Sequence, residues 1–257
     1  MTEEDLDWKA YVAGFHRTRP GVTEAVLSRV SAGDHSPYRW LARAVSADAT
    51  TVLDLACGSG PMSRLLAEPG RTVVGVDLSS EELALAAGRG PGPWVRADAL
   101  ALPVRDGSVD VVTSSLGLVV ITPLADVLAE VVRVLRPGGV LAAIAPAVRP
   151  LGPSDLWVLS RINLRLRAKP RFPGAVEIAG FAEALAAAGL TRVEDKRERY
   201  YFTVGSREDA ELVLSGLYLP TTRPSRVTAA AEFLEDRLRR HGPVEIAIPM
   251  RRIVAIK

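Results

Sequence analysis

The feature that most constrains the fold of this chain is the stretch TVLDLACGSGPM at residues 51–62. A short apolar run containing Asp54 leads directly into a glycine-rich turn, which is the pattern of a buried parallel strand. Gly58 and Gly60 lack a Cβ atom, so the backbone can turn tightly and a ligand can lie against it. Pro61 suits the first position of a helix, where its missing N–H is not needed. This strand–turn–helix unit predicts a cradle for a small molecule at the edge of a parallel sheet.

The pattern around the turn excludes two common nucleotide-binding motifs. A dinucleotide fingerprint requires a third glycine where Ser63 stands, and no Gly-Lys-Ser/Thr follows as in a P-loop. The segment DLACGSG instead resembles the D-x-x-x-G-x-G signature of class I S-adenosylmethionine (SAM)-dependent methyltransferases, in particular the small-molecule, type 11-like members. The resemblance implies SAM as the cofactor and S-adenosylhomocysteine as its product.

The next predicted strand ends in an acid with a suitable spacing. Asp77 follows Gly58 by 19 residues, and an acid at this distance can accept hydrogen bonds from both hydroxyls of a ribose. The alternative is that Asp77 caps the following helix, although Ser79 or Ser80 can cap it equally well.

A second acid, Asp98, ends the third predicted strand, at residues 94–98. The family resemblance assigns its carboxylate to the adenine amine and the Ala99 N–H to a ring nitrogen; the alternative is a simple turn cap. The full set of cofactor-binding residues that the resemblance implies is Tyr11, Asp54, Ala56, Cys57, Gly58, Gly60, Asp77, Leu78, Asp98, Ala99, Ser114 and Ser115.

Strand-like and helix-like segments alternate through residues 50–146, and the LRPGG segment before the fifth predicted strand also resembles the superfamily. We therefore expect an α/β fold with a seven-stranded, mostly parallel, doubly wound sheet and a helical cap or lid. The predicted organisation is a helical leader at 1–49, a SAM-binding core at 50–204 with an insertion at 147–175, a helical lid at 205–242 and a final core strand at 243–257.

Few side chains in the sequence could act in proton transfer. The only histidines are His16, His35 and His241, and His16 is the best candidate for a catalytic base because it ends the predicted helix over the cofactor mouth. The alternative is an ordinary turn or surface histidine. Cys57 is rejected as a nucleophile because no histidine accompanies it in the motif.

The tip of the fourth predicted strand, residues 109–115, points to the acceptor class. It lacks the Asn/Asp-Pro-Pro-Tyr motif of base-amino methyltransferases and places no obvious acid for a metal. We expect metal-independent, in-line methyl transfer to a small-molecule acceptor, such as one of secondary metabolism. The alternatives are a SAM-binding protein that does not methylate, with a structural cofactor or a cyclase-type activity, and an RNA or protein methyltransferase.

The segment at 147–175 is locally basic through Arg161, Arg165, Lys169 and Arg171, which suggests an acceptor pocket that binds a carboxylate or phosphate, or alternatively a solvated basic face. The net charge of +2, the single cysteine and the lack of a long apolar run favour a cytoplasmic protein. We expect no nucleic-acid or membrane partner, and a monomer or homodimer.

Overall fold

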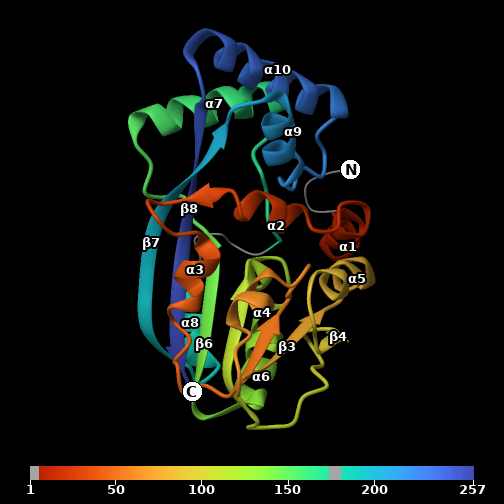
Figure 1. Cartoon of the computed structure of the whole chain (residues 1–257), viewed down its shortest axis with the longest axis vertical. Coiled ribbons are helices and arrows are strands. Elements are labelled where there is room, and N and C mark those ends of the chain that lie inside the picture. The colour runs from red at the N-terminus through yellow and green to blue at the C-terminus, as the bar shows by residue number, and fades with distance from the viewer. Residues whose placement is uncertain (1–5, 174–180) are drawn as a thin grey trace.

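The computed structural model describes residues 6–173 and 181–257, and it contains one central sheet flanked by helices (Figure 1). The strands are β1 (Val30–Ser31), β2 (Thr51–Leu55), β3 (Thr72–Asp77), β4 (Trp94–Arg96), β5 (Val109–Ser115), β6 (Leu135–Pro146), β7 (Thr191–Val204) and β8 (Val244–Ile256). Their order in the sheet is β1-β7-β8-β6-β5-β2-β3-β4. The five strands from β6 to β4 are parallel, whereas β8 pairs antiparallel with both β6 and β7.

The expected α/β class and mostly parallel sheet are confirmed, but the sheet has eight strands in the described part of the chain rather than seven. The additional strand is β1, in the leader, where Val30 pairs with Phe202 of β7. Two residues are enough to form this strand because the outer edge of β7 has unpaired backbone N–H and C=O groups, which can pair with a short segment.

The two faces of the sheet are covered by different helices. One face packs against α2 (Val22–Leu27), α3 (Pro37–Ala42) and α4 (Pro61–Leu66), and the other against α6 (Leu124–Val134) and α8 (Phe181–Ala187). The apolar stripe of α6, with Val127, Leu128 and Val131 fully buried, follows the helical spacing seen in the sequence. This layering is the doubly wound arrangement that the alternation of elements predicts.

The helices α7 (Pro153–Leu166), α9 (Arg207–Ser215) and α10 (Pro224–His241) form a lobe at one end of the molecule (Figure 1). The long strands β7 and β8 extend towards this lobe, and α1 (Trp8–Thr18) and α5 (Ser80–Arg89) lie beside each other below it. Buried Phe15 and Tyr218, with Tyr11 and Phe172, form an aromatic seam that joins the leader to the segment after α9. The predicted leader and lid therefore meet each other.

One local expectation differs from the structure. The apolar spacing from Leu124 predicts a helix that ends at the glycines at 138–139, but α6 already ends at Val134, and Leu135 is extended and paired with Val109. The spacing at 178–188 predicts a helix that is present as α8 from Phe181, and residues 178–180 lie outside the described part of the chain.

Candidate cofactor and acceptor site

A cavity of about 920 Å³ lies where the carboxyl ends of the parallel strands meet the leader and the helical lobe. It extends from the glycine-rich turn and the ends of β3 and β4 to an apolar chamber beneath α7 and α9. The predicted site residues that line it are Asp54, Ala56, Cys57, Gly58, Asp77, Leu78, Asp98, Ala99, Ser115 and His16.

The glycine-rich turn is tied to the neighbouring strand. The Gly58 N–H donates to the Asp77 carboxylate at 2.8 Å, and the Cys57 N–H donates to the Val76 carbonyl at 3.0 Å. Gly58 has a φ of +53° and Gly60 a φ of +77°, in the left-handed region that favours glycine. A Cβ atom on Gly60 would lie 2.5 Å from the Trp94 ring, so this glycine also allows close packing.

The carboxylate of Asp77 is held by backbone donors on both oxygens. Besides Gly58, the Ser79 N–H donates to it at 2.9 Å. The side chain of Ser79, not that of Asp77, accepts from the Glu82 N–H and caps α5. Burial raises the pKa of Asp77. Each carboxylate oxygen has a further lone pair, so both can still accept from a bound diol.

Asp54 lies beneath the turn, almost fully buried. Its carboxylate accepts hydrogen bonds from Ser63 Oγ at 2.6 Å and Thr113 Oγ1 at 3.1 Å. Burial raises its pKa to about 6, against the opposing effect of those hydrogen bonds. The side chain therefore links β5 to the start of α4 beneath the turn, and its protonation state depends on how fully the carboxylate is buried.

The end of β4 is covered by the leader. Asp98 accepts from the Leu100 N–H at 3.1 Å and forms an ion pair with Lys9 of α1 at 3.1 Å. The Leu100 hydrogen bond is the main reason that the pKa of Asp98 is lowered. The Ala99 side chain is nearly buried beside it. The predicted adenine pocket is thus bordered by a residue of α1 that the sequence did not indicate.

Three predicted cofactor residues do not line the cavity. Tyr11 lies in the aromatic seam, where its hydroxyl accepts from the Leu219 N–H at 2.9 Å. Ser114 is fully buried in β5, and Gly60 begins α4 against Trp94. Cys57 lines the cavity, but its thiol is largely buried, which raises its pKa and agrees with its rejection as a nucleophile.

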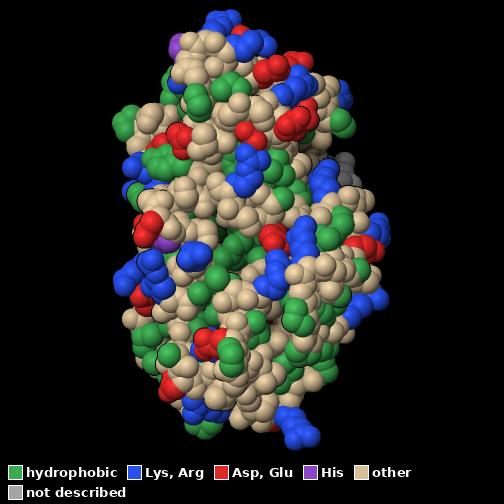
Figure 2. Space-filling view, viewed as in Figure 1, with side chains coloured by type: hydrophobic (Ala, Val, Ile, Leu, Met, Phe, Trp, Pro, Cys, Tyr) green, Lys and Arg blue, Asp and Glu red, His purple; other side chains and the backbone are tan. Residues whose placement is uncertain are grey.

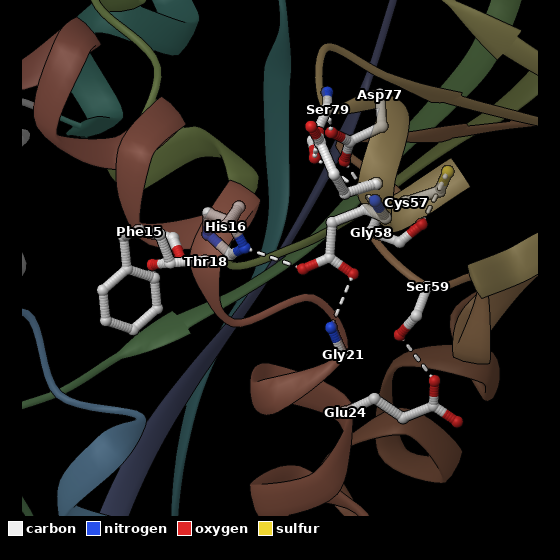
Figure 3. Close-up of polar contacts among 12 residues, drawn as sticks. Phe15, His16, Thr18, Gly21, Glu24, Cys57, Gly58, Ser59, Asp77 and Ser79 are labelled. Atoms are coloured by element: carbon white, nitrogen blue, oxygen red, sulfur yellow. Dashed lines mark hydrogen bonds and ion pairs between the residues drawn. The ribbon is translucent and has the colours of Figure 1, made fainter. Parts of the chain in front are cut away.

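His16 joins two residues that the sequence analysis did not single out. Its Nδ1 lies 2.8 Å from Oε1 of Glu82, and its Nε2 lies 2.7 Å from the hydroxyl of Tyr218. Figure 3 shows the imidazole and the Gly21 N–H reaching the same carboxylate. Glu82 is 2% exposed although it is an acid, so this contact is built into the interior. The sequence does contain a signal for the burial of Glu82, because this acid lies on the same side of the helix as Leu83 and Ala86.

A half-buried acid, Glu24 of α2, joins the leader to the turn (Figure 3). Its carboxylate accepts from Ser59 Oγ at 2.6 Å and forms ion pairs with Arg64 and Arg89, both at 2.5 Å. The leader therefore contacts the cofactor-binding turn through side chains and does not simply pack on the sheet.

The basic segment after β6 contributes to the cavity in a different way from that expected. Leu159, Ile162 and Asn163 of α7 line it, whereas Arg161 and Arg165 do not. These arginines stack on Trp157 and Phe233 at the surface. Lys169 of the same basic segment does line the cavity, so contact of this segment with an anionic group of the acceptor stays a prediction for Lys169 and not for these two arginines.

The residues present fit SAM. The turn has two glycines with positive φ, Asp77 can accept from a ribose, and Ser115 at the end of β5 has a buried Oγ without a hydrogen-bond partner in the described residues. Among those residues, no group of three or more His, Cys, Asp and Glu side chains is placed to hold a metal ion. Fold and cavity together define an α/β protein that binds a nucleoside-containing ligand at the carboxyl ends of its parallel strands.

Comparison with known proteins agrees with this class. Residues 53–143 match the family described as a methyltransferase domain. The chain is 43% identical over 105 residues to a demethylmenaquinone methyltransferase of Beutenbergia cavernae, covering 40% of this chain and 44% of that one. It is 35% identical over 138 residues to a malonyl-(acyl-carrier protein) O-methyltransferase of Enterobacter lignolyticus, covering 53% of each. The chain spans about half the length of these curated relatives.

A solved structure covers nearly the whole chain. The crystal structure of the cyclase SpnF has a TM-score of 0.60 and 16% identity, covering 96% of this chain and 94% of that one. At this identity the likeness shows the fold. Residues 53–143 of this chain are similar to the methyltransferase domains of the class I SAM-dependent superfamily.

Proposed function

We propose that the protein is a SAM-dependent methyltransferase that acts on a small-molecule acceptor. The observation that carries this proposal is the continuity of one cavity, from the acids at the ends of β3 and β4 into an apolar chamber. The chamber is lined by Leu159 and Ile162 of α7, Leu214 of α9, and Ile246 and Met250 of β8. Cofactor and acceptor would therefore share a single enclosure.

In this proposal Asp77 binds the ribose hydroxyls, Asp98 and the Ala99 N–H bind adenine, and the turn at Gly58 lies along the amino-acid part. When bound, SAM supplies a methyl group on a positively charged sulfur. The chain then needs to align the acceptor, exclude water and take up any proton that the acceptor releases. The aromatic seam with Phe15, Phe172 and Tyr218 closes the enclosure on the side of the leader.

His16 is the group we propose to receive that proton. Its Nδ1–H donates to Glu82, which leaves Nε2 as an acceptor for the Tyr218 hydroxyl. Burial raises the pKa of Tyr218, so this side chain is a neutral phenol at ordinary pH. The acceptor proton moves to the Tyr218 oxygen while the Tyr218 proton moves to Nε2, and Glu82 stabilises the imidazolium that results.

The acceptor class follows from the lining of the chamber. Its side chains are mainly aliphatic, with Asn163 among the few polar ones, and such pockets select apolar molecules with one or two polar groups. The two curated relatives named above are named for a menaquinone precursor and a malonyl-acyl carrier protein. We propose an apolar acceptor with an ionisable hydroxyl.

The decisive experiment is to incubate the protein and methyl-labelled SAM with an extract of its host. The label is then partitioned between organic-soluble, RNA and protein fractions. We expect label in the organic fraction. Label in RNA or protein would mean that the acceptor is a macromolecule, while the reaction would still be methyl transfer from SAM. Binding of SAM without incorporation into any fraction, under conditions where a known methyltransferase is active in the same extract, would favour a protein that binds SAM without methylating.

A further inference from the structure

The helix α7 presents different side chains on three sides. Val158, Ile162 and Leu166 are buried against the core, and Leu159 and Asn163 line the cavity. The remaining side carries Leu156 (55% exposed), Trp157 (42%) and Leu164 (65%). A surface helix with one buried stripe ordinarily carries polar residues on its outer side. The outer side of α7 therefore requires an explanation.

These exposed side chains are concentrated in one place. In the described part of the chain seven large hydrophobic residues are exposed, and four of them, Val148, Leu156, Trp157 and Leu164, lie within residues 148–164. Single exposed apolar residues are normal on a protein surface, whereas a cluster marks a surface that meets something apolar. We call the three on α7, Leu156, Trp157 and Leu164, the α7 patch, whereas Val148 precedes the helix and lines the cavity.

The surroundings of the α7 patch are strongly basic. Residues 147–173 contain six Arg or Lys and one acid, in a chain whose net charge is +2. The acid is Asp155, which is buried and paired with Arg199 at 2.9 Å. The neighbouring helix α10 carries three acids and four arginines, and its Asp236 is paired with Arg239 and Arg240 of the same helix. The charge next to the patch is therefore positive.

The basic and apolar side chains are interleaved. Arg161 and Arg237 lie over the ring of Trp157, at 5.4 Å and 4.7 Å from its centroid. Guanidinium groups stacked in this way remain charged and keep their outer edge available. Figure 2 shows hydrophobic, basic and acidic side chains next to one another on the helical lobe. An amphipathic tryptophan among arginines is the composition of helices that lie in a membrane interface.

We propose that α7 docks on an anionic lipid bilayer, with the α7 patch entering the boundary between headgroups and acyl chains. Leu156, Trp157 and Leu164 would supply the apolar contact, and Arg161 and Arg237 beside Trp157 would meet the lipid phosphates. An acidic protein with an apolar surface is the alternative occupant, and absence of vesicle binding by the wild type would favour it. The docking requires neither cofactor nor acceptor. If the proposed function also holds, the cavity-lining edge of α7 would face an apolar acceptor dissolved in the bilayer.

This proposal replaces the expectation of no membrane partner. That expectation rested on the lack of a long apolar run, and in the described residues no helix is long and apolar enough to cross a bilayer. Lying on a membrane has different requirements, namely an exposed apolar stripe and neighbouring positive charge.

The test is co-sedimentation of the full chain with vesicles of phosphatidylcholine alone and with about one third phosphatidylglycerol. We expect at least about tenfold stronger partitioning onto the anionic vesicles, decreasing with salt. The double variant Leu156→Ser/Leu164→Ser should lose most of this binding. The matched control is Leu65→Ser/Val193→Ser, which removes two exposed apolar side chains (41% and 54% exposed) outside the patch and should bind as the wild type does. Thermal melts test whether each variant is folded. Because the changed positions are exposed, we expect melting temperatures close to that of the wild type.

Three results would overturn the proposal. The first is equal partitioning of the wild type onto neutral and anionic vesicles, and the second is equal loss of binding in the patch variant and the control. The third is a patch variant that binds anionic vesicles as strongly as the wild type does, which would show that Leu156 and Leu164 do not meet the bilayer. Because no methyl transfer is measured, failure of the proposed function leaves these outcomes interpretable.

Discussion

Nδ1 of His16 lies 2.8 Å from Oε1 of Glu82, although 66 residues separate the two in the chain. The contact joins α1 of the leader to the first turn of α5, which follows the strand that ends in Asp77. With Tyr218 on the other imidazole nitrogen, one histidine connects leader, core and lid. A buried carboxylate that orients an imidazole fixes its tautomer, because only one nitrogen can then carry the proton.

The first prediction concerns that tautomer. We expect His16 to carry its proton on Nδ1 at neutral pH, as seen in nitrogen chemical shifts from ¹⁵N-labelled histidine. The chain has three histidines, so comparison with His16→Gln identifies the signal. Tyr218→Phe should move the Nε2 shift and leave Nδ1 protonated. An Nε2–H tautomer would contradict the assignment of Glu82 as the acceptor.

The second prediction concerns turnover. His16→Gln should lower kcat by about 10²-fold or more, because the glutamine amide cannot take up a proton. Tyr218→Phe should also lower kcat, while both variants keep the affinity for S-adenosylhomocysteine within a few-fold. His241→Gln, at the exposed end of α10, is the matched control and should leave kcat unchanged. An unchanged kcat in His16→Gln would remove the proposed base.

The third prediction concerns the ribose contact. Asp77→Ala should weaken binding of SAM or S-adenosylhomocysteine at least about tenfold, because two charge-assisted hydrogen bonds are lost. Titration calorimetry measures the change directly. Asp106→Ala removes a largely exposed acid paired with Arg133 and serves as the control. Near-native affinity in Asp77→Ala would refute its assigned role.

The fourth prediction uses the raised pKa of Asp54. Its pKa increases from 3.8 to about 6 on folding, so the folded state binds more protons than the unfolded state between these values. The stability contributed by Asp54 is therefore present at low pH and is lost as the pH rises through this window. Asp54→Asn cannot titrate. Between about pH 4 and pH 7, the unfolding free energy of the wild type should fall by about 3 kcal/mol relative to this variant. Urea unfolding at a series of pH values checks this, and a constant difference would contradict it.

The fifth prediction compares two glycines. Gly60→Ala should destabilise the protein by more than about 1 kcal/mol, because its φ of +77° is strained for alanine and the new Cβ meets Trp94. Gly88→Ala, in α5 with nothing within 4 Å of its new Cβ, should be neutral or stabilise by about 0.5–1 kcal/mol. Thermal unfolding of both variants gives the comparison. Equal effects would show that the turn tolerates a side chain.

Expectations based on local patterns agree closely with the structure. The fourth predicted strand, at 109–115, has the bounds of β5, and the final predicted strand, at 243–257, differs from β8 by one residue at each end, because strand periods are properties of consecutive residues. The acids at the ends of β3 and β4 reach the cavity for the same reason, since parallel strands end at one edge of a sheet. The strand β1 was missed because two residues carry no period, and only the edge of β7 makes them a strand.

By itself the sequence determined the order of elements, the glycine-rich turn and the acids beside it, since each depends on near neighbours in the chain. Tertiary structure alone decided which distant groups meet. Glu82 with His16, Tyr218 with His16, and Glu24 with Arg64 join segments whose separation no local period encodes. It also decided that Arg161 and Arg165 point away from the cavity, because the side of α7 that is buried depends on what α7 packs against. Burial then determined the charge behaviour of Asp54, since desolvation acts only once the surrounding chain has closed over the carboxylate.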